Sequence, residues 1–266
     1  MQLHINHSTR YSYDQPVTYA LQKVRLRPVD DPMQTVGDWD VTVTGGKKET
    51  SYRDHYGNHV DLVSTTPGET ALTITASGTV TTHDTAGILG KRYGRAPLWH
   101  FKQATALTTP GDAIAGLAND HLPEKTDLLD ALHGLSAAIL TATPYKTGQT
   151  SADTTGEAAI AIGHGVCQDH AHIMIAAARK TGLSARYVSG YLMMNDRVDQ
   201  DASHAWAEVH VDGLGWVGFD VSNGVSPDER YVRVATGRDA QDAAPISGLR
   251  LGSGDESMIV SLQVQQ

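Results

Sequence analysis

The sequence contains a single cysteine, Cys167, among its 266 residues. One cysteine excludes an internal disulfide framework, and a free thiol persists best in a reducing compartment. The N-terminal residues show no apolar core of a secretory signal, so we expect a cytoplasmic protein. The sequence also lacks any run of roughly 18 to 20 apolar residues, the length that a membrane-spanning helix needs.

Clusters of basic residues are absent as well. The 21 Lys and Arg residues are scattered among 30 Asp and Glu residues, and the net charge is −9. We therefore expect no nucleic-acid partner and no anionic membrane surface. Hydrophobic residues make up 40% of the chain, which is enough for a sizeable core in one large domain or two ordinary ones.

The first part of the chain has the pattern of β-structure. Apolar and polar residues alternate over 39–43 and 72–80, as in half-buried strands. The pairs Gly45-Gly46 and Gly57-Asn58 supply turns that accept positive φ. These features predict an antiparallel β-sandwich domain over residues 1–85.

The remainder, residues 86–266, is predicted to form an α+β core. One helix is expected to start at Asp112 and a second to span 127–143. A short third helix opens at 154–157 and runs through Ile162, and a fourth runs from Cys167 to a stop at Gly182. Strands are expected over 185–194, 204–211 and 216–221, with a weaker last strand over 259–264.

Cys167 falls in the first turn of its predicted helix, directly after Gly165 and Val166. The unpaired backbone N–H groups and the helix dipole at that position stabilise a thiolate. A free cysteine is nevertheless most often a small buried hydrophobe, so its position alone is weak evidence for a nucleophile.

The two strands that follow strengthen that interpretation. In the strand that begins at His204, even positions up to His210 are polar or aromatic and odd positions are apolar. The strand over 216–221 also has apolar residues at its odd positions. A three-residue loop at 212–214 places both apolar faces on one side of a hairpin. In that register His204 and Asp220 become diagonal neighbours, roughly 7–8 Å apart at Cα.

A thiol, an imidazole and a carboxylate in this arrangement form a nucleophilic site, with Cys167, His204 and Asp220 as candidate catalytic residues. Each of the three residues, taken alone, has an ordinary structural explanation. For His204 in particular, the chain has 13 histidines, so one can fall at this position by chance. A zinc site is disfavoured because His170 and His172 point to different faces of a helix. We expect neither a metal nor another cofactor.

Four segments closely resemble the bacterial transglutaminase-like proteins, namely 165–172, 185–192, 202–209 and 215–220. Together with flanking matches, the resemblance covers nearly the whole chain. The resemblance implies an N-terminal β-domain followed by a papain-related core, with Cys167 as nucleophile, His204 as base and Asp220 as orienter. Two positions differ from the family pattern. His170 replaces the usual Phe or Tyr, and Val221-Ser222-Asn223 replaces Pro-Thr-Asn.

The predicted function is thiol-dependent attack on a peptide, isopeptide or side-chain amide through a thioester. Hydrolysis is favoured over cross-linking, because the sequence shows no calcium loop and no motif for docking an amine acceptor. Trp206 and Trp216 oppose this choice, since both fall on the polar strand face and would form a cleft that excludes water. A cross-linking transglutaminase and a non-catalytic peptide-binding module are the alternatives.

Overall fold

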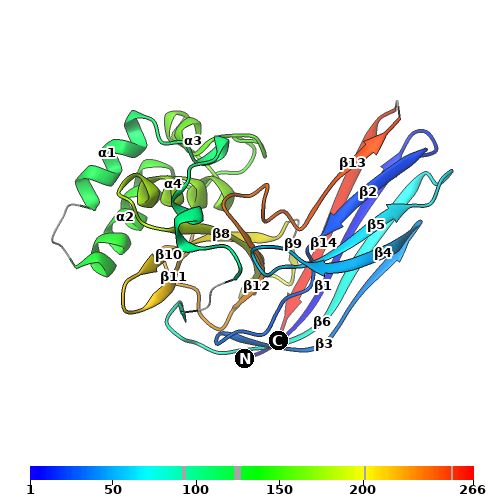
Figure 1. The fold of residues 1–266 in the computed structure, drawn as a ribbon, viewed down its shortest axis with the longest axis horizontal. Helices are drawn as coiled ribbons and strands as arrows, with labels where there is room; N and C mark the ends of the chain where they lie inside the picture. Colours follow the sequence, from blue (N-terminus) through cyan, green and yellow to red (C-terminus); the bar gives the residue numbers. More distant parts are fainter. Residues whose placement is uncertain (92–93, 123–126, 201, 253) are drawn as a thin grey trace.

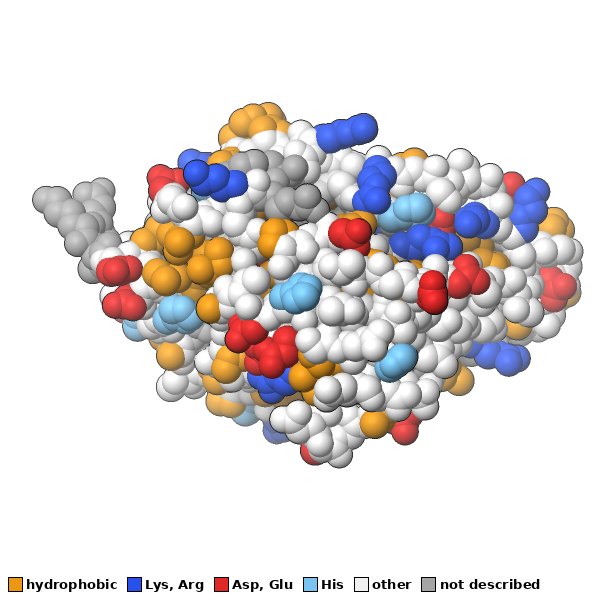
Figure 2. Space-filling view, turned by 90° about the horizontal axis from the view of Figure 1, so that it is seen from below, with side chains coloured by type: hydrophobic (Ala, Val, Ile, Leu, Met, Phe, Trp, Pro, Cys, Tyr) orange, Lys and Arg blue, Asp and Glu red, His pale blue; other side chains and the backbone are white. Residues whose placement is uncertain are grey.

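The computed structural model describes residues 1–91, 94–122, 127–200, 202–252 and 254–266. Strands hold 43% of the residues and helices 21%, so β-structure outweighs the helical part of the predicted α+β fold. Two antiparallel sheets lie at one end of the molecule, and a third sheet with its helices lies at the other (Figure 1). On the face in Figure 2, Lys and Arg side chains are interspersed with Asp and Glu.

The two N-terminal sheets enclose one hydrophobic cluster, to which Leu72 and Ile74 contribute from one sheet and Ala20 and Val63 from the other. The first has the order β3 (Gln34–Thr44), β6 (Ala71–Thr82), β1 (Gln2–Tyr13), β14 (Glu256–Gln265) and β9 (Asp199–Gln200). The second has the order β13 (Ile246–Leu251), β2 (Tyr19–Val24), β5 (His59–Thr65) and β4 (Gly46–Arg53).

The last two strands belong to these sheets and not to the sheet of the core. β14 pairs with β1 along its whole length, from His4 opposite Gln265 to Tyr13 opposite Glu256. β13 pairs with β2. The predicted strand at 259–264 is therefore present within β14, where it lies between β1 and β9. The boundary at residue 85 stays a prediction.

The third sheet carries the predicted hairpin, and one of its four described helices packs directly on the sheet while the other three pack around that helix. Its order is β12 (Tyr231–Gly237), β8 (Ala185–Leu192), β10 (His204–Val211), β11 (Gly215–Phe219) and β7 (Ile88–Gly90). The helices are α1 (Asp112–His121), α2 (Leu128–Ala142), α3 (Gly156–Ile162) and α4 (Cys167–Lys180), with short 3₁₀ turns η1 (Leu98–Lys102) and η2 (Ala106–Thr108). Within the described chain, no helix is long and apolar enough to cross a membrane.

The helix ends follow the signals in the sequence. The Asp127 carboxylate accepts hydrogen bonds from the Leu129 and Asp130 N–H groups at the start of α2. Gly182 follows α4 with φ of 85°, the left-handed conformation that glycine adopts without strain. The predicted boundaries of both helices are confirmed within one or two residues.

A buried ionic network joins the core to the N-terminal region. Glu208 on β10 accepts from Arg186 Nε at 2.6 Å and from Arg233 Nε at 2.7 Å. Arg233 also donates to Asp31 at 2.8 Å, and its backbone N–H donates to the Gln34 side chain at 2.8 Å. The carboxylate of Glu208 thus links β8, β10 and β12 and, through Arg233, the segment before β3.

We expect Glu208→Gln to lower the free energy of unfolding by about 3 to 5 kcal/mol, because it leaves two buried guanidinium groups without their shared carboxylate. Urea unfolding followed by tryptophan fluorescence measures the loss. Glu69→Gln, at an exposed position, is the matched control and should change stability little. Equal losses in the two variants would contradict this role for Glu208.

Candidate active site

Cys167 is the first residue of α4, and its backbone is held by the residues around it. The Asp169 carboxylate accepts from the Val166 N–H at 2.8 Å and from the Thr150 hydroxyl at 2.7 Å. A Cβ at Gly165 would lie only 2.8 Å from the Cβ of Asp169, so glycine is required for this close approach. Asp169 therefore fixes the turn that presents the thiol.

The hairpin of β10 and β11 has the predicted register. Val211 lies opposite Gly215, Val209 opposite Val217 and Ala207 opposite Phe219, which leaves residues 212–214 as the loop. The odd, apolar positions pack in the same hydrophobic cluster as the buried face of α4. The even positions carry His204 on the other face.

The structure brings the three candidate residues together. His204 Nε2 lies 2.6 Å from Asp220 Oδ2, and an interaction with the Cys167 side chain is among the causes that raise the pKa of His204. The carboxylate occupies Nε2, which leaves Nδ1 as the ring nitrogen available to the thiol. Asp220 is fully buried and His204 nearly so, whereas Cys167 is partly exposed. A group outside the protein can thus reach the sulfur and not the carboxylate.

Two further residues hold the Asp220 carboxylate. The Tyr231 hydroxyl and the Asn223 side-chain amide each donate to Oδ2 at 2.7 Å. Asn223 is the one residue of the triplet 221–223 that matches the family pattern. That match is the only feature of the sequence that points to a role for Asn223 in the site. Nothing marked Tyr231, because its approach depends on the pairing of β12 with β8.

The electrostatics favour an ion pair. Burial alone lowers the pKa of His204, but the hydrogen bonds to Asp220 and Cys167 and the charges of these residues raise it to about 10. Burial raises the pKa of Asp220, yet the bonds from His204, Asn223 and Tyr231 and the charge of His204 hold it below its usual value. His204 is therefore protonated opposite an ionised Asp220 at neutral pH.

The two departures from the family pattern contact one another. His170 Nε2 donates to the Thr143 carbonyl at 2.6 Å, so Nδ1 accepts from the Ser222 hydroxyl at 2.8 Å. Burial lowers the pKa of His170 and keeps the ring neutral. His172 accepts from the Ala240 N–H at 3.1 Å, and burial lowers its pKa to about 4. Among the described residues no group of three or more ligand side chains could hold a metal ion.

A cavity of about 380 Å³ opens beside Cys167 and His204. Small, uncharged side chains dominate its wall, with one carboxylate, Asp153, and no Lys or Arg among the described lining residues. Trp206 and Trp216 are 1% and 0% exposed and do not line it. The cleft anticipated from these two tryptophans is therefore not formed, because other residues cover their strand face. The apolar lining comes from Ala152, Val166, Ala202, Ala205, Ala240, Ala243, Ala244 and Pro245.

We expect Asp220→Asn to lower the pKa of His204 from about 10 towards or below 6.5, because burial remains and the carboxylate is lost. Nuclear magnetic resonance of the imidazole measures this directly. In the wild type the raised pKa means that protonated His204 stabilises the fold fully below pH 6.5, and this contribution is lost as pH rises to about 10. The variant should lose that pH dependence in urea unfolding.

Asp120→Asn makes the same carboxylate-to-amide change at an exposed position on α1 and is the control. It should leave the pKa of His204 unchanged. An unchanged His204 titration in Asp220→Asn would show that the carboxylate does not govern the imidazole.

Known proteins are similar to this chain over nearly its whole length. Residues 3–81 match the family "Bacterial transglutaminase-like N-terminal region", and residues 116–221 match the "Transglutaminase-like superfamily". Uncharacterized proteins of Mycobacterium leprae and Mycobacterium tuberculosis are 29% and 30% identical over 98% of this chain, covering 98% and 91% of those proteins. The crystal structure of a proposed cysteine protease from Cytophaga hutchinsonii superposes with a TM-score of 0.76, at 24% identity, over 100% of this chain and 91% of that one, which shows a shared fold. The chain belongs to the bacterial transglutaminase-like family.

Proposed function

We propose that the protein is a thiol-dependent enzyme that cleaves amide bonds through a thioester, with Cys167 as nucleophile, His204 as base and acid, and Asp220 as orienter. The observation that carries this proposal is the placement of Cys167 and His204 on the wall of one cavity, with the His204 ring hydrogen-bonded to the buried Asp220. A free structural cysteine has no need of a buried imidazole whose far nitrogen is clamped by a carboxylate.

In this proposal, the thiol proton already resides on His204, so that an imidazolium lies opposite the Cys167 thiolate before the substrate binds. The sulfur attacks the amide carbon, and the backbone N–H of Cys167 helps hold the oxyanion, since a first-turn N–H has no partner within its helix. The C–N bond then breaks while His204 returns the proton to the leaving amine or ammonia. Water attacks the thioester, His204 accepts its proton, and the carboxylic acid and the free thiol are released.

The substrate we propose is a peptide, isopeptide or side-chain amide. The uncharged wall of small side chains around Cys167 suits a neutral acyl group. Hydrolysis is proposed over cross-linking because the tryptophans that would exclude water lie outside the cavity. The free thiol suits the reducing conditions of the cytoplasm, which we propose as the site of action.

We expect Cys167→Ala to abolish amide turnover while leaving the unfolding free energy within about 1 kcal/mol of the wild type, because the side chain is partly exposed. A library of peptide amides is incubated with each protein, and the acyl-enzyme and the released acid are followed by mass spectrometry. Near wild-type turnover in the folded variant would remove Cys167 from the mechanism.

Alkylation separates this enzyme from a binding module on the same fold. The wild type should react stoichiometrically with iodoacetamide at about pH 6, where an ordinary thiol is protonated and slow. His204→Gln should react slowly there and faster at high pH, while His121→Gln, which changes a histidine at the end of α1, should match the wild type. Equal rates in all three proteins would favour a non-catalytic thiol.

We expect free acid to outweigh amine adduct when a peptide amide is offered together with a millimolar primary amine. Water reaches the thioester in a partly open cavity, and nothing in its described lining marks an amine site. The two products are separated and counted by mass spectrometry. An excess of the amine adduct would make the protein a cross-linking transglutaminase.

A further inference from the structure

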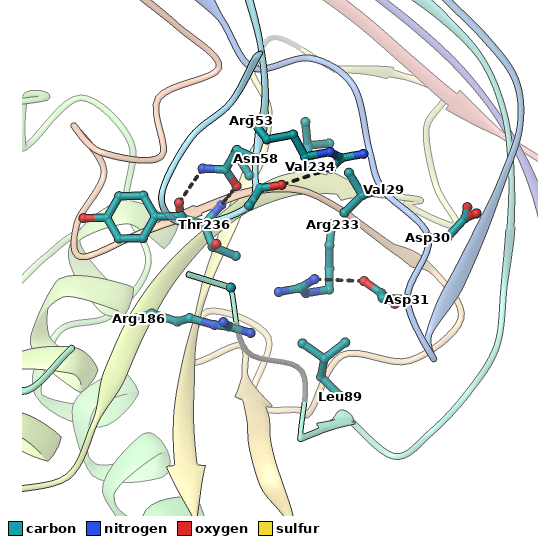
Figure 3. Close-up of a pocket in the computed structure, with 14 residues that line it drawn as sticks. Val29, Asp30, Asp31, Arg53, Asn58, Leu89, Arg186, Arg233, Val234 and Thr236 are labelled. Atoms are coloured by element: carbon teal, nitrogen blue, oxygen red, sulfur yellow. Dashed lines mark hydrogen bonds and ion pairs between the residues drawn. The ribbon is translucent and has the colours of Figure 1, made fainter. Parts of the chain in front are cut away.

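A second cavity of about 360 Å³ lies between the N-terminal region and the third sheet. It is lined by residues 29–31, Arg53 and residues 56–58 on one side and by Arg186 on β8 and residues 233–236 on β12 on the other (Figure 3). None of its described lining residues belongs to the cavity beside Cys167. It is therefore a separate site, for which the proposed chemistry has no use.

Arg186 is the charged group at the base of this cavity. Its side chain is 5% exposed, its Nε donates to Glu208, and its guanidinium lies 4.0 Å from the centre of the Trp216 ring. Its two terminal nitrogens make no hydrogen bond with any residue that the structure describes, and Figure 3 shows the guanidinium pointing into the cavity. Two parallel N–H donors on a planar group match a carboxylate.

The charge of Arg186 is balanced through a shared network, but its terminal nitrogens remain unpaired among the described residues. Its carboxylate partner, Glu208, is shared with Arg233, which also pairs with Asp31. Burial is the main influence on the pKa of Arg186 and lowers it to about 10 despite the attraction of Glu208. An anion in the cavity would therefore add hydrogen-bond partners for a buried guanidinium that has only one in the described part of the chain.

The acidic residues at the cavity are already engaged. Asp31 accepts from Arg233 at 2.8 Å and from the Met33 N–H at 2.8 Å, and Asp30 accepts from the Val36 N–H at 2.8 Å. Across the cavity from Arg186, Figure 3 shows Arg53, an exposed side chain whose Nη1 donates to the Gly57 carbonyl at 3.0 Å. Arg53 adds a second positive charge at the mouth.

Aliphatic side chains also line the cavity. Val29 and Leu89 lie above and below the Arg233–Asp31 pair in Figure 3, and Val234 and Ala235 belong to the lining along β12. β12 has a register shift between Arg233 and Ala235, a bulge of the kind that redirects side chains beside binding sites. The cavity thus offers a cationic end and an apolar side to the same small ligand.

We propose that this cavity binds a small organic carboxylate with a short apolar body. The carboxylate pairs with the terminal nitrogens of Arg186, the apolar body lies against Val29 and Leu89, and Arg53 attracts the anion at the mouth. The volume lies near the lower limit of small-molecule sites, roughly 300–1,000 Å³, which excludes a large ligand. A free carboxylic acid and the C-terminus of a short peptide share this chemistry.

Isothermal titration calorimetry at constant ionic strength, with chloride as the balancing anion, tests the proposal on the full chain. The probes are acetate, hexanoate, inorganic phosphate and acetyl-leucyl-leucine. We expect saturable binding that is tighter for hexanoate than for acetate. Arg186→Lys, which keeps the charge beside Glu208 but loses the planar pair of donors, should weaken hexanoate binding roughly tenfold. Arg53→Gln should weaken it about threefold.

Arg10→Gln removes another exposed arginine, on β1, and is the matched control, with unchanged affinity expected. If acetyl-leucyl-leucine binds more tightly than hexanoate, the site is assigned to a peptide C-terminus. If the peptide binds more weakly than hexanoate, the site is assigned to a free carboxylic acid. The proposal is overturned by a lack of saturable binding, by phosphate binding more tightly than hexanoate, or by equal affinity in the Arg53, Arg186 and Arg10 variants. If Arg186→Lys fails to fold, Arg53→Gln against Arg10→Gln still decides.

Discussion

The buried carboxylate of Glu208 is the interaction on which the arrangement of the molecule depends. Placing one carboxylate and two guanidinium groups away from water is costly unless their geometry is satisfied, and here every bond from Glu208 is between 2.6 and 3.1 Å. The network fixes β8, β10 and β12 side by side and, through Asp31, the N-terminal segment against them. Each of these three strands also carries residues of the site around Cys167.

That arrangement explains how the active site is kept in position. β10 begins with His204, and β12 begins with Tyr231, which donates to Asp220. A second carboxylate, Asp220, thus receives three donors from β10, β12 and the turn after β11. The imidazole is held on one edge by this carboxylate and faces Cys167 with the other. Two buried carboxylates, Glu208 on β10 and Asp220 directly after β11, align the strands and the reacting groups.

Much of this site could be predicted from the sequence, because the signals were local or had a fixed period. The alternation on two strands and a three-residue loop leave only one register that buries both apolar faces, and that register brings His204 to Asp220. The start of α4 at Cys167 follows from its flanking residues. Parity, however, gives the face of a side chain and not what covers it. Trp206 and Trp216 therefore lie buried instead of walling the cleft, and the approach of Tyr231 and the pairing of β14 depend on contacts between distant segments.

The position of β14 has a consequence for the order of folding. β1 lies between β6 and β14, and these partners are separated from it by very different lengths of chain. During synthesis β6 is available early, but the other edge of β1 stays unpaired until residues 256–265 have been made. The whole core is synthesised in that interval. An exposed strand edge is a template for wrong pairing, so the nascent chain depends on rapid folding of its core, or on a chaperone, to reach the last strand unaggregated.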